Sequence, residues 1–109
     1  MTFAKNPGGE RAGEAGWPSS QRRAFLERLG AQGYAPYTLG EYGSITGRFC
    51  AAIESRAFGV GGLNGATTER LRRMVLREVP EYARTYAKFC LGRFINHLVE
   101  AGVATAPRP

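Results

Sequence analysis

In the first half of the chain, apolar residues recur three and four positions apart, as they do on the buried face of a helix. One such stretch predicts a helix over about 20–31, where Ser19 or Ser20 can cap the start. A second helix is predicted from Pro36 to about Arg56, because proline is preorganised for the first helical turn. The apolar positions are Phe25, Leu26 and Leu29 in the first helix and Leu39, Tyr42, Ile45, Phe49 and Ile53 in the second.

The second half of the chain repeats this spacing in two further stretches. A third helix is predicted to start at about Thr67, the expected N-cap, and to end before Pro80. A fourth helix spans about 81–101, with Gly102 as its C-terminal stop. Its broad apolar face consists of Ala83, Ala87, Cys90, Leu91, Phe94, Ile95 and Leu98.

These patterns predict an all-α domain, a compact bundle of four helices. No stretch alternates at period two for long enough to indicate a strand. Residues 57–66 are expected to form a glycine-rich loop, with a fifth short helical turn as the alternative. Residues 1–18 lack periodicity and are interpreted as a flexible arm, which leaves 19–104 as the helical domain. Three apolar residues of the loop are expected to pack against the bundle: Phe58, Val60 and Leu63.

The charge of the chain is strongly positive. Fifteen Lys and Arg residues against nine acids, all of them Glu, give a formal net charge of +6, and the excess lies within 21–109. Such a field favours a polyanionic partner, most simply nucleic acid. The alternative is a basic surface that only keeps the domain soluble.

The residue types that build catalytic or metal sites are scarce. Cys50 and Cys90 lie far apart without a CxxC pair, and His97 is the single histidine, so zinc ligands are lacking. The glycines of GVGGLNG are not followed by the lysine of a phosphate-binding loop. We therefore expect no metal, no cofactor and no enzyme activity of the domain itself. Without a long apolar run, a cytoplasmic location without membrane contact is expected.

Three stretches together resemble the N-terminal core-binding domain of tyrosine recombinases, the SAM-like domain of phage integrases. In YAPYTLGEYGSITGRFC the resemblance is carried by Thr38, Tyr42 and Phe49, although Ala35 stands where the family usually has a serine cap. LNGATTERLRRMV resembles the helix that follows. The closing helix LGRFINHLVEAGVA matches through Leu91, Phe94, Ile95, Leu98, Gly102 and Val103.

The resemblance implies a module that clamps duplex DNA together with a catalytic domain on its C-terminal side and assembles with further copies on DNA. Residues 105–109 would start the linker to that absent domain. Catalytic residues of the family belong to the second domain, so none is expected here. A bound module would be nucleoid-associated.

In the resembled family the N-terminal parts of the second and fourth helices face the major groove. Carried over by position, this implies DNA contacts from Tyr37 and Thr38, with a local backbone role as the alternative for Thr38. On the fourth helix it implies Arg84, Thr85 and Lys88, which a helical wheel puts on one flank away from the apolar face. Two further arginines, Arg48 and Arg93, are candidates for phosphate contacts.

Several residues leave two interpretations open. Tyr82 and Phe89 lie on the polar side of the fourth helix and are expected to pack under the first helix, or else to mark a contact between molecules. Trp17 is either an anchor or part of the arm. The third-helix stripe of Arg70, Arg73 and Arg77 is interpreted as a solvated face that adds long-range attraction.

Three glycines inside the second helix also require an explanation, because glycine lowers helix stability. They form one narrow stripe beside the apolar face. We expect Gly43 and Gly47 to allow close packing of the fourth helix, and Gly40 to lie on the DNA side. A helical protein-interaction module with an incidentally basic surface is the alternative to the DNA-binding function.

Overall fold

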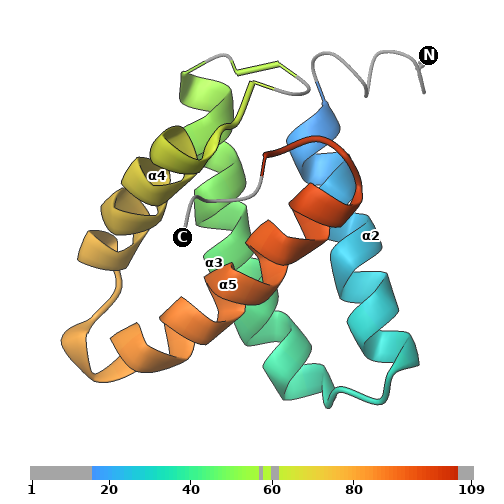
Figure 1. Ribbon diagram of the computed structural model, residues 1–109. Coiled ribbons are helices and arrows are strands. Elements are labelled where there is room, and N and C mark those ends of the chain that lie inside the picture. Colours follow the sequence, from blue (N-terminus) through green and yellow to red (C-terminus); the bar gives the residue numbers. More distant parts are fainter. Residues whose placement is uncertain (1–15, 57, 60–61, 106–109) are drawn as a thin grey trace, which may run out of the picture.

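The computed structural model describes residues 16–56, 58–59 and 62–105. Four α-helices account for most of this chain: α2 (Trp17–Ala31), α3 (Pro36–Ser55), α4 (Gly65–Glu78) and α5 (Arg84–Glu100). A short 3₁₀ turn, η1 (Glu81–Ala83), precedes α5 (Figure 1). The described residues contain no strand beyond one isolated bridge, so the prediction of an all-α, four-helix domain is confirmed.

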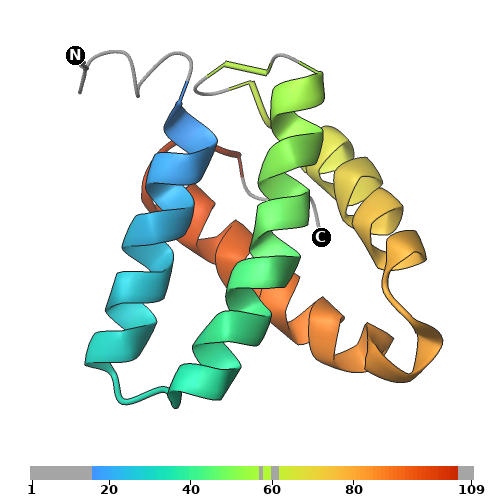
Figure 2. The same ribbon diagram turned by 180° about the vertical axis from the view of Figure 1, so that it is seen from behind.

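The long helix α3 is the centre of the fold and contacts each of the other three helices. It forms an antiparallel hairpin with α2, while α5 crosses one face of this pair and α4 lies along the other side of α3 (Figures 1 and 2). Among these helices α2 and α4 do not contact each other. None of them combines the length and the apolarity that a bilayer span requires.

Three phenylalanines from three helices form the middle of the core. Phe25 of α2, Phe49 of α3 and Phe94 of α5 are fully buried. The ring of Phe94 lies 5.1 Å from that of Phe25 and 6.0 Å from that of Phe49, measured between centroids. Burial of a phenylalanine side chain contributes roughly 1.5–3 kcal/mol, so these contacts fix how α5 crosses the α2–α3 pair.

The first helix begins earlier than the sequence pattern predicts. Trp17 and Pro18 are buried residues of α2, and Gly16 occupies the N-cap without a side-chain cap. The assignment of Pro18 to a flexible arm is therefore wrong, as is capping by Ser19 or Ser20, and of the two interpretations of Trp17 the structure supports the anchor. The reason is tertiary, because the Trp17 indole is 2% exposed and its Nε1–H donates to the carbonyl of Phe58 at 3.0 Å. Residues 1–15 lie outside the described chain.

The start of α4 also differs from the prediction. Asn64 is the N-cap, and its side-chain oxygen accepts the backbone N–H of Thr67 at 2.9 Å. Thr67 is thus a residue of the first turn and not the cap. Among the described residues the extra helical turn is η1, ahead of α5, and residues 57, 60 and 61 of the predicted loop lie outside the described chain.

The connection before α4 packs against the end of the chain. Leu63 is fully buried and Phe58 is partly buried against the core, as predicted, whereas Val60 lies outside the described residues. The backbone N–H of Thr105 donates to the Leu63 carbonyl at 2.8 Å, and Leu63 forms a parallel bridge with Ala104.

The closing helix follows its prediction closely. Its predicted apolar residues are buried, except that Ala83 of η1 is only partly so. Gly102 has a φ of 81°, a left-handed conformation that glycine adopts without strain. After it, the backbone N–H of Val103 donates to the Leu98 carbonyl at 3.0 Å, which satisfies the end of the helix.

The glycine stripe of α3 faces a different neighbour from the one expected. A Cβ at Gly43 would lie 3.3 Å from Nη2 of Arg22 and 3.5 Å from Cδ1 of Leu26, both on α2. A Cβ at Gly47 would lie 3.5 Å from Nε of the same arginine. At Gly43 and Gly47 the stripe therefore packs against α2 and not against the fourth helix, because α5 crosses the face of the α2–α3 pair and does not lie beside these glycines.

Candidate nucleic-acid interface

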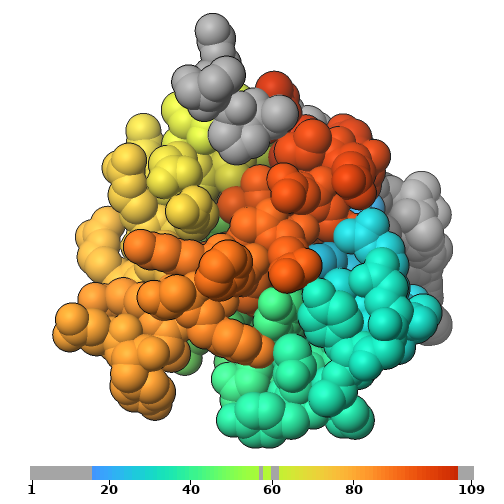
Figure 3. Space-filling view, turned by 60° about the horizontal axis from the view of Figure 1, so that its bottom comes forward, coloured from blue at the N-terminus to red at the C-terminus, as the bar shows by residue number. Residues whose placement is uncertain are grey.

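The N-terminal ends of α3 and α5 meet on one face of the domain. Between them lies an open hollow of about 320 Å³, which we call the aromatic hollow. Figure 3 shows this face, with the start of α5 in orange and the α2–α3 turn and start of α3 in blue-green. The hollow is lined by Tyr37, Thr38 and Glu41 from α3 and by Tyr82, Ala83 and Tyr86 from η1 and α5.

The α3 side of the hollow follows from its local sequence. Pro36 starts the helix, and Ala35 at the N-cap contributes no side-chain hydrogen bond. Tyr37 is 79% exposed and Thr38 is half-buried in the wall of the hollow. Gly40, one turn further along, is exposed and has open space beyond its Cα. The two residues that the resemblance assigns to the start of this helix, Tyr37 and Thr38, are thus accessible to a ligand, and so is Gly40 of the glycine stripe.

Aromatic side chains on the α5 side are unusually exposed. Tyr82 is 91% and Phe89 is 65% exposed, so the expectation that they pack under the first helix is wrong. Tyr82 belongs to η1, which lies ahead of α5 and beyond the reach of α2, and Phe89 is on the outer side of α5. Their other interpretation, a contact between molecules, stays a prediction.

Tyr86 contributes to the aromatic hollow although the sequence analysis did not single it out. Its ring meets the ring of buried Tyr42 edge to face, with 5.6 Å between centroids. Burial raises the pKa of Tyr86, so its hydroxyl stays protonated at neutral pH. The sequence did contain a signal for this residue. Tyr86 follows Tyr82 by four positions, and Glu41 follows Tyr37 by four, so each pair is expected on one side of its predicted helix.

Arg84 does not share a free flank with Thr85 and Lys88. Its Nε–H donates to the backbone carbonyls of Leu76 at 3.0 Å and Val79 at 3.2 Å. These carbonyls lie at the C-terminal end of α4, where backbone acceptors have no partner within the helix. Arg84 is therefore half-buried and caps α4, while Thr85 and Lys88 are exposed.

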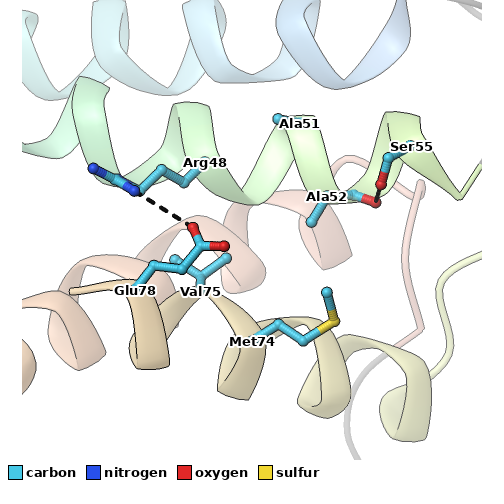
Figure 4. Close-up of a pocket in the computed structure, with 7 residues that line it drawn as sticks. All are labelled: Arg48, Ala51, Ala52, Ser55, Met74, Val75 and Glu78. Carbon is cyan, nitrogen blue, oxygen red and sulfur yellow. Dashed lines mark hydrogen bonds and ion pairs between the residues drawn. The ribbon is translucent and has the colours of Figure 1, made fainter.

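Arg48 lies away from the aromatic hollow. Its Nη1 is 3.4 Å from Oε1 of Glu78, which joins α3 to α4 across a separate hollow of about 290 Å³. Figure 4 shows this ion pair between the two helices, with Ala52 on α3 and Met74 and Val75 on α4. An exposed pair of this kind contributes less than about 1 kcal/mol, and it leaves Arg48 partly neutralised.

Arg93 lies on the exposed side of α5, two turns beyond Tyr86. Burial raises the pKa of Tyr42, and the positive charge of nearby Arg93 opposes that rise. Among the described residues neither Arg93 nor Lys88 forms an ion pair. Both cations are therefore exposed and carry a charge that no carboxylate of the described residues offsets.

Two arginines of α4 border a further depression of the surface. Arg73 and Arg77 join Arg84 and Leu76 around a further hollow of about 300 Å³ between the end of α4 and the start of α5, which we call the arginine hollow. The predicted solvated stripe of α4 is thus not uniform. Its C-terminal part borders this depression, whereas Arg70 does not line it.

The groups that could hold a metal or act as nucleophiles are dispersed or buried. Within the described ranges no three His, Cys or Glu side chains lie close enough to hold an ion. His97 packs between Phe25 and Phe94, with its Nε2 at 2.9 Å from Oε1 of Gln21. Burial raises the pKa of the Cys50 thiol to about 12 and that of Cys90 to about 12. Both thiols therefore stay protonated inside the core.

Comparison with known proteins adds no assignment. No protein-family model, no curated protein and no solved structure matches this chain.

Proposed function

We propose that this domain binds duplex DNA and serves as the N-terminal core-binding domain of a site-specific tyrosine recombinase. The observation that carries the proposal is the convergence of the α3 and α5 N-terminal ends on the aromatic hollow. These are the two helix starts that the sequence resemblance assigns to the major groove. The net charge of +6 supplies the long-range attraction.

In this proposal the cations and the hydroxyl groups have different tasks. Lys88 and Arg93 are exposed and without ion pairs in the described chain, so they pair with phosphates. The hydroxyl groups of Thr38 and Thr85 donate to phosphate or base edges, and exposed Tyr37 packs on a sugar. Gly40 lets the duplex approach the α3 backbone. Catalysis belongs to a separate C-terminal domain of the parent protein.

The salt dependence of binding tests the proposal. Fluorescence anisotropy with a labelled duplex should give an affinity that falls steeply between 50 and 200 mM salt, with a logarithmic slope of about −0.9 for each phosphate neutralised. The double variant Lys88→Gln/Arg93→Gln should reduce the magnitude of that slope by roughly 1.8 and weaken binding at low salt at least about tenfold.

The matched control removes two charges elsewhere on the molecule. Arg23 and Arg56 are exposed, and Arg56 follows the C-terminal end of α3, roughly 30 Å along the helix from the aromatic hollow. Arg23→Gln/Arg56→Gln should therefore keep most of the affinity. Absence of binding by the unaltered domain contradicts the proposed function, and equal losses in the two double variants contradict the site.

A protein-interaction module is the second candidate, and the exposure of Tyr82 and Phe89 favours it. On that alternative the domain shifts no duplex at low salt and instead self-associates or binds a protein partner. Sedimentation equilibrium distinguishes the two, since Tyr82→Ser/Phe89→Ser should abolish a concentration-dependent dimer. The same double variant should weaken DNA binding only slightly if the cations carry it.

A further inference from the structure

The arginine hollow concentrates positive charge in one place. Arg73 and Arg77 lie on successive turns at the end of α4, and Arg84 is the first residue of α5. The two helix ends lie side by side at the lower left of Figure 1. Leu76, only 9% exposed, completes the lining with an apolar side chain.

Arg84 is already fixed in place before any ligand binds. Its Nε–H is shared between the carbonyls of Leu76 and Val79, which orients the planar guanidinium. In the part of the chain that the structure describes, its two terminal nitrogens make no hydrogen bond. Their N–H groups are therefore available to an anion, and little side-chain entropy is lost when they bind it.

The surrounding carboxylates do not balance this charge. Arg77 forms no ion pair among the described residues, and Glu78 pairs with Arg48 on the other side of α4. Glu69 is shared, with Oε1 3.7 Å from Nη1 of Arg72 and Oε2 3.8 Å from Nε of Arg73. Of the three arginines that line the hollow, only Arg73 has a carboxylate partner among the described residues, and a bound anion would lower the repulsion among their charges.

A purely structural role explains part of this arrangement. Cations near the C-terminal end of a helix are favoured by its dipole, which accounts for Arg77 and for the capping by Arg84. It does not account for Arg73, which lies a full turn further from the helix end, nor for the depression that the three side chains share.

We infer that the arginine hollow binds a backbone phosphate of duplex DNA, as a second contact beside the aromatic hollow. A phosphodiester is a tetrahedral oxyanion, and the guanidinium fork matches its geometry with paired N–H donors. Ala83 of the aromatic hollow and Arg84 of the arginine hollow are neighbours in sequence, so one DNA backbone can pass over both. The inference rests on the proposed function and extends its footprint to α4.

Two single variants on the same helix test it. Arg77 lines the hollow, whereas Arg70 is also exposed on α4 and does not line it. In duplex titrations at several salt concentrations, Arg77→Gln should lower the magnitude of the salt slope by about 0.9, and Arg70→Gln should leave it nearly unchanged. Arg77→Lys keeps the charge but loses the fork, and should recover part of the affinity. Thermal unfolding of each variant checks that the domain remains folded.

A second measurement separates a built phosphate site from diffuse attraction. Titration of the unaltered domain with inorganic phosphate, followed by NMR of the arginine Nε–H signals, should shift Arg73, Arg77 and Arg84 together and leave Arg70 and Arg23 in place. DNA binding with equal slopes for Arg77→Gln and Arg70→Gln overturns the inference and leaves the proposed function standing. Failure of the unaltered domain to bind duplex overturns both, even where inorganic phosphate shifts the three arginines.

Discussion

Arg22 of α2 donates its Nε–H to the backbone carbonyl of Gly43 in α3 at 3.0 Å. The guanidinium thus lies flat against the stripe of α3 that has no side chains, and it reaches past Gly43 to Gly47. A side chain on one helix bonds to the main chain of its neighbour, which closes the α2–α3 hairpin over its glycines.

This contact predicts different effects for three glycine substitutions. Alanine at Gly40 meets nothing within 4 Å, and alanine at Gly47 meets Arg22 only at ordinary contact distance. Both variants should gain up to about 1 kcal/mol in free energy of unfolding from helix propensity. Gly43→Ala places its Cβ 3.3 Å from Nη2 of Arg22, so the guanidinium must shift and the gain should be largely lost. Urea titrations of the three variants measure their free energies of unfolding. A loss of stability for Gly47→Ala contradicts the prediction.

The start of α4 provides a second prediction, because two residues compete for the role of cap. Asn64→Ala removes the oxygen that accepts the Thr67 N–H and should lower the free energy of unfolding by about 1 kcal/mol. Thr67→Ala leaves that bond intact and should change stability by less than half as much. The reverse order in thermal or chemical unfolding would mean that Thr67 is the cap after all.

Trp17 provides the third prediction. Trp17→Ala should destabilise the domain by about 3–5 kcal/mol, because it empties a buried site. Trp17→Phe keeps most of the volume but leaves the Phe58 carbonyl without the indole N–H, so a loss of about 1–2 kcal/mol is expected. Far-ultraviolet circular dichroism during urea unfolding measures both, since the variants lack the single tryptophan. A change within error for Trp17→Ala would return this residue to the flexible arm.

The fourth prediction concerns pH. Burial, and secondly the charge of Arg28, hold the pKa of His97 below its usual range, and Glu100 opposes this. Nδ1 of His97 is buried without a hydrogen-bond partner in the described chain. The folded domain therefore resists a proton that the unfolded chain accepts near pH 6.5. The free energy of unfolding should therefore be highest above pH 6.5, and it should decrease at lower pH by at most about 1.4 kcal/mol per pH unit.

The matched variant for this effect is His97→Gln, which cannot titrate. Its free energy of unfolding should be lower at pH 7 because packing against Phe25 and Phe94 is lost, but the decline between pH 7 and pH 5 should be smaller than in the unaltered domain. Superimposable pH profiles would remove His97 as the cause.

The sequence was sufficient for most of the helical framework. The predicted second helix differs from α3 by a single residue at its end, because Pro36 and the regular apolar spacing are local signals. The cap of α4 was missed although it is local, since Asn64 bonds a residue three positions on, whereas the start of α2 depends on a tertiary contact. Trp17 is helical because its indole finds the Phe58 carbonyl, and no local pattern in a glycine-rich segment reveals that contact.

The candidate interface likewise contains residues that the sequence pattern places correctly and contacts that depend on tertiary packing. A helical wheel places Arg84 on the polar flank of its helix, but it cannot show that the carbonyls at the end of α4 lie within reach of that flank. The wheel also assigns Phe89 to the polar side of its helix, but it cannot show that no other helix covers this side chain. The meeting of Tyr37 with Tyr82 and Tyr86 around one hollow depends on how α5 crosses α3, which is a property of the packed core.

The bridge between Leu63 and Ala104 has a mechanical consequence. It ties the residue just before α4 to the chain just after α5, so both helices belong to one closed loop. Opening the bridge releases both ends of that loop at once, while the buried ring of Phe94 still holds α5 on Phe25 and Phe49. The amide proton of Thr105, which bonds to the Leu63 carbonyl, should accordingly exchange with a lower opening free energy than the amide protons in the middle of α5.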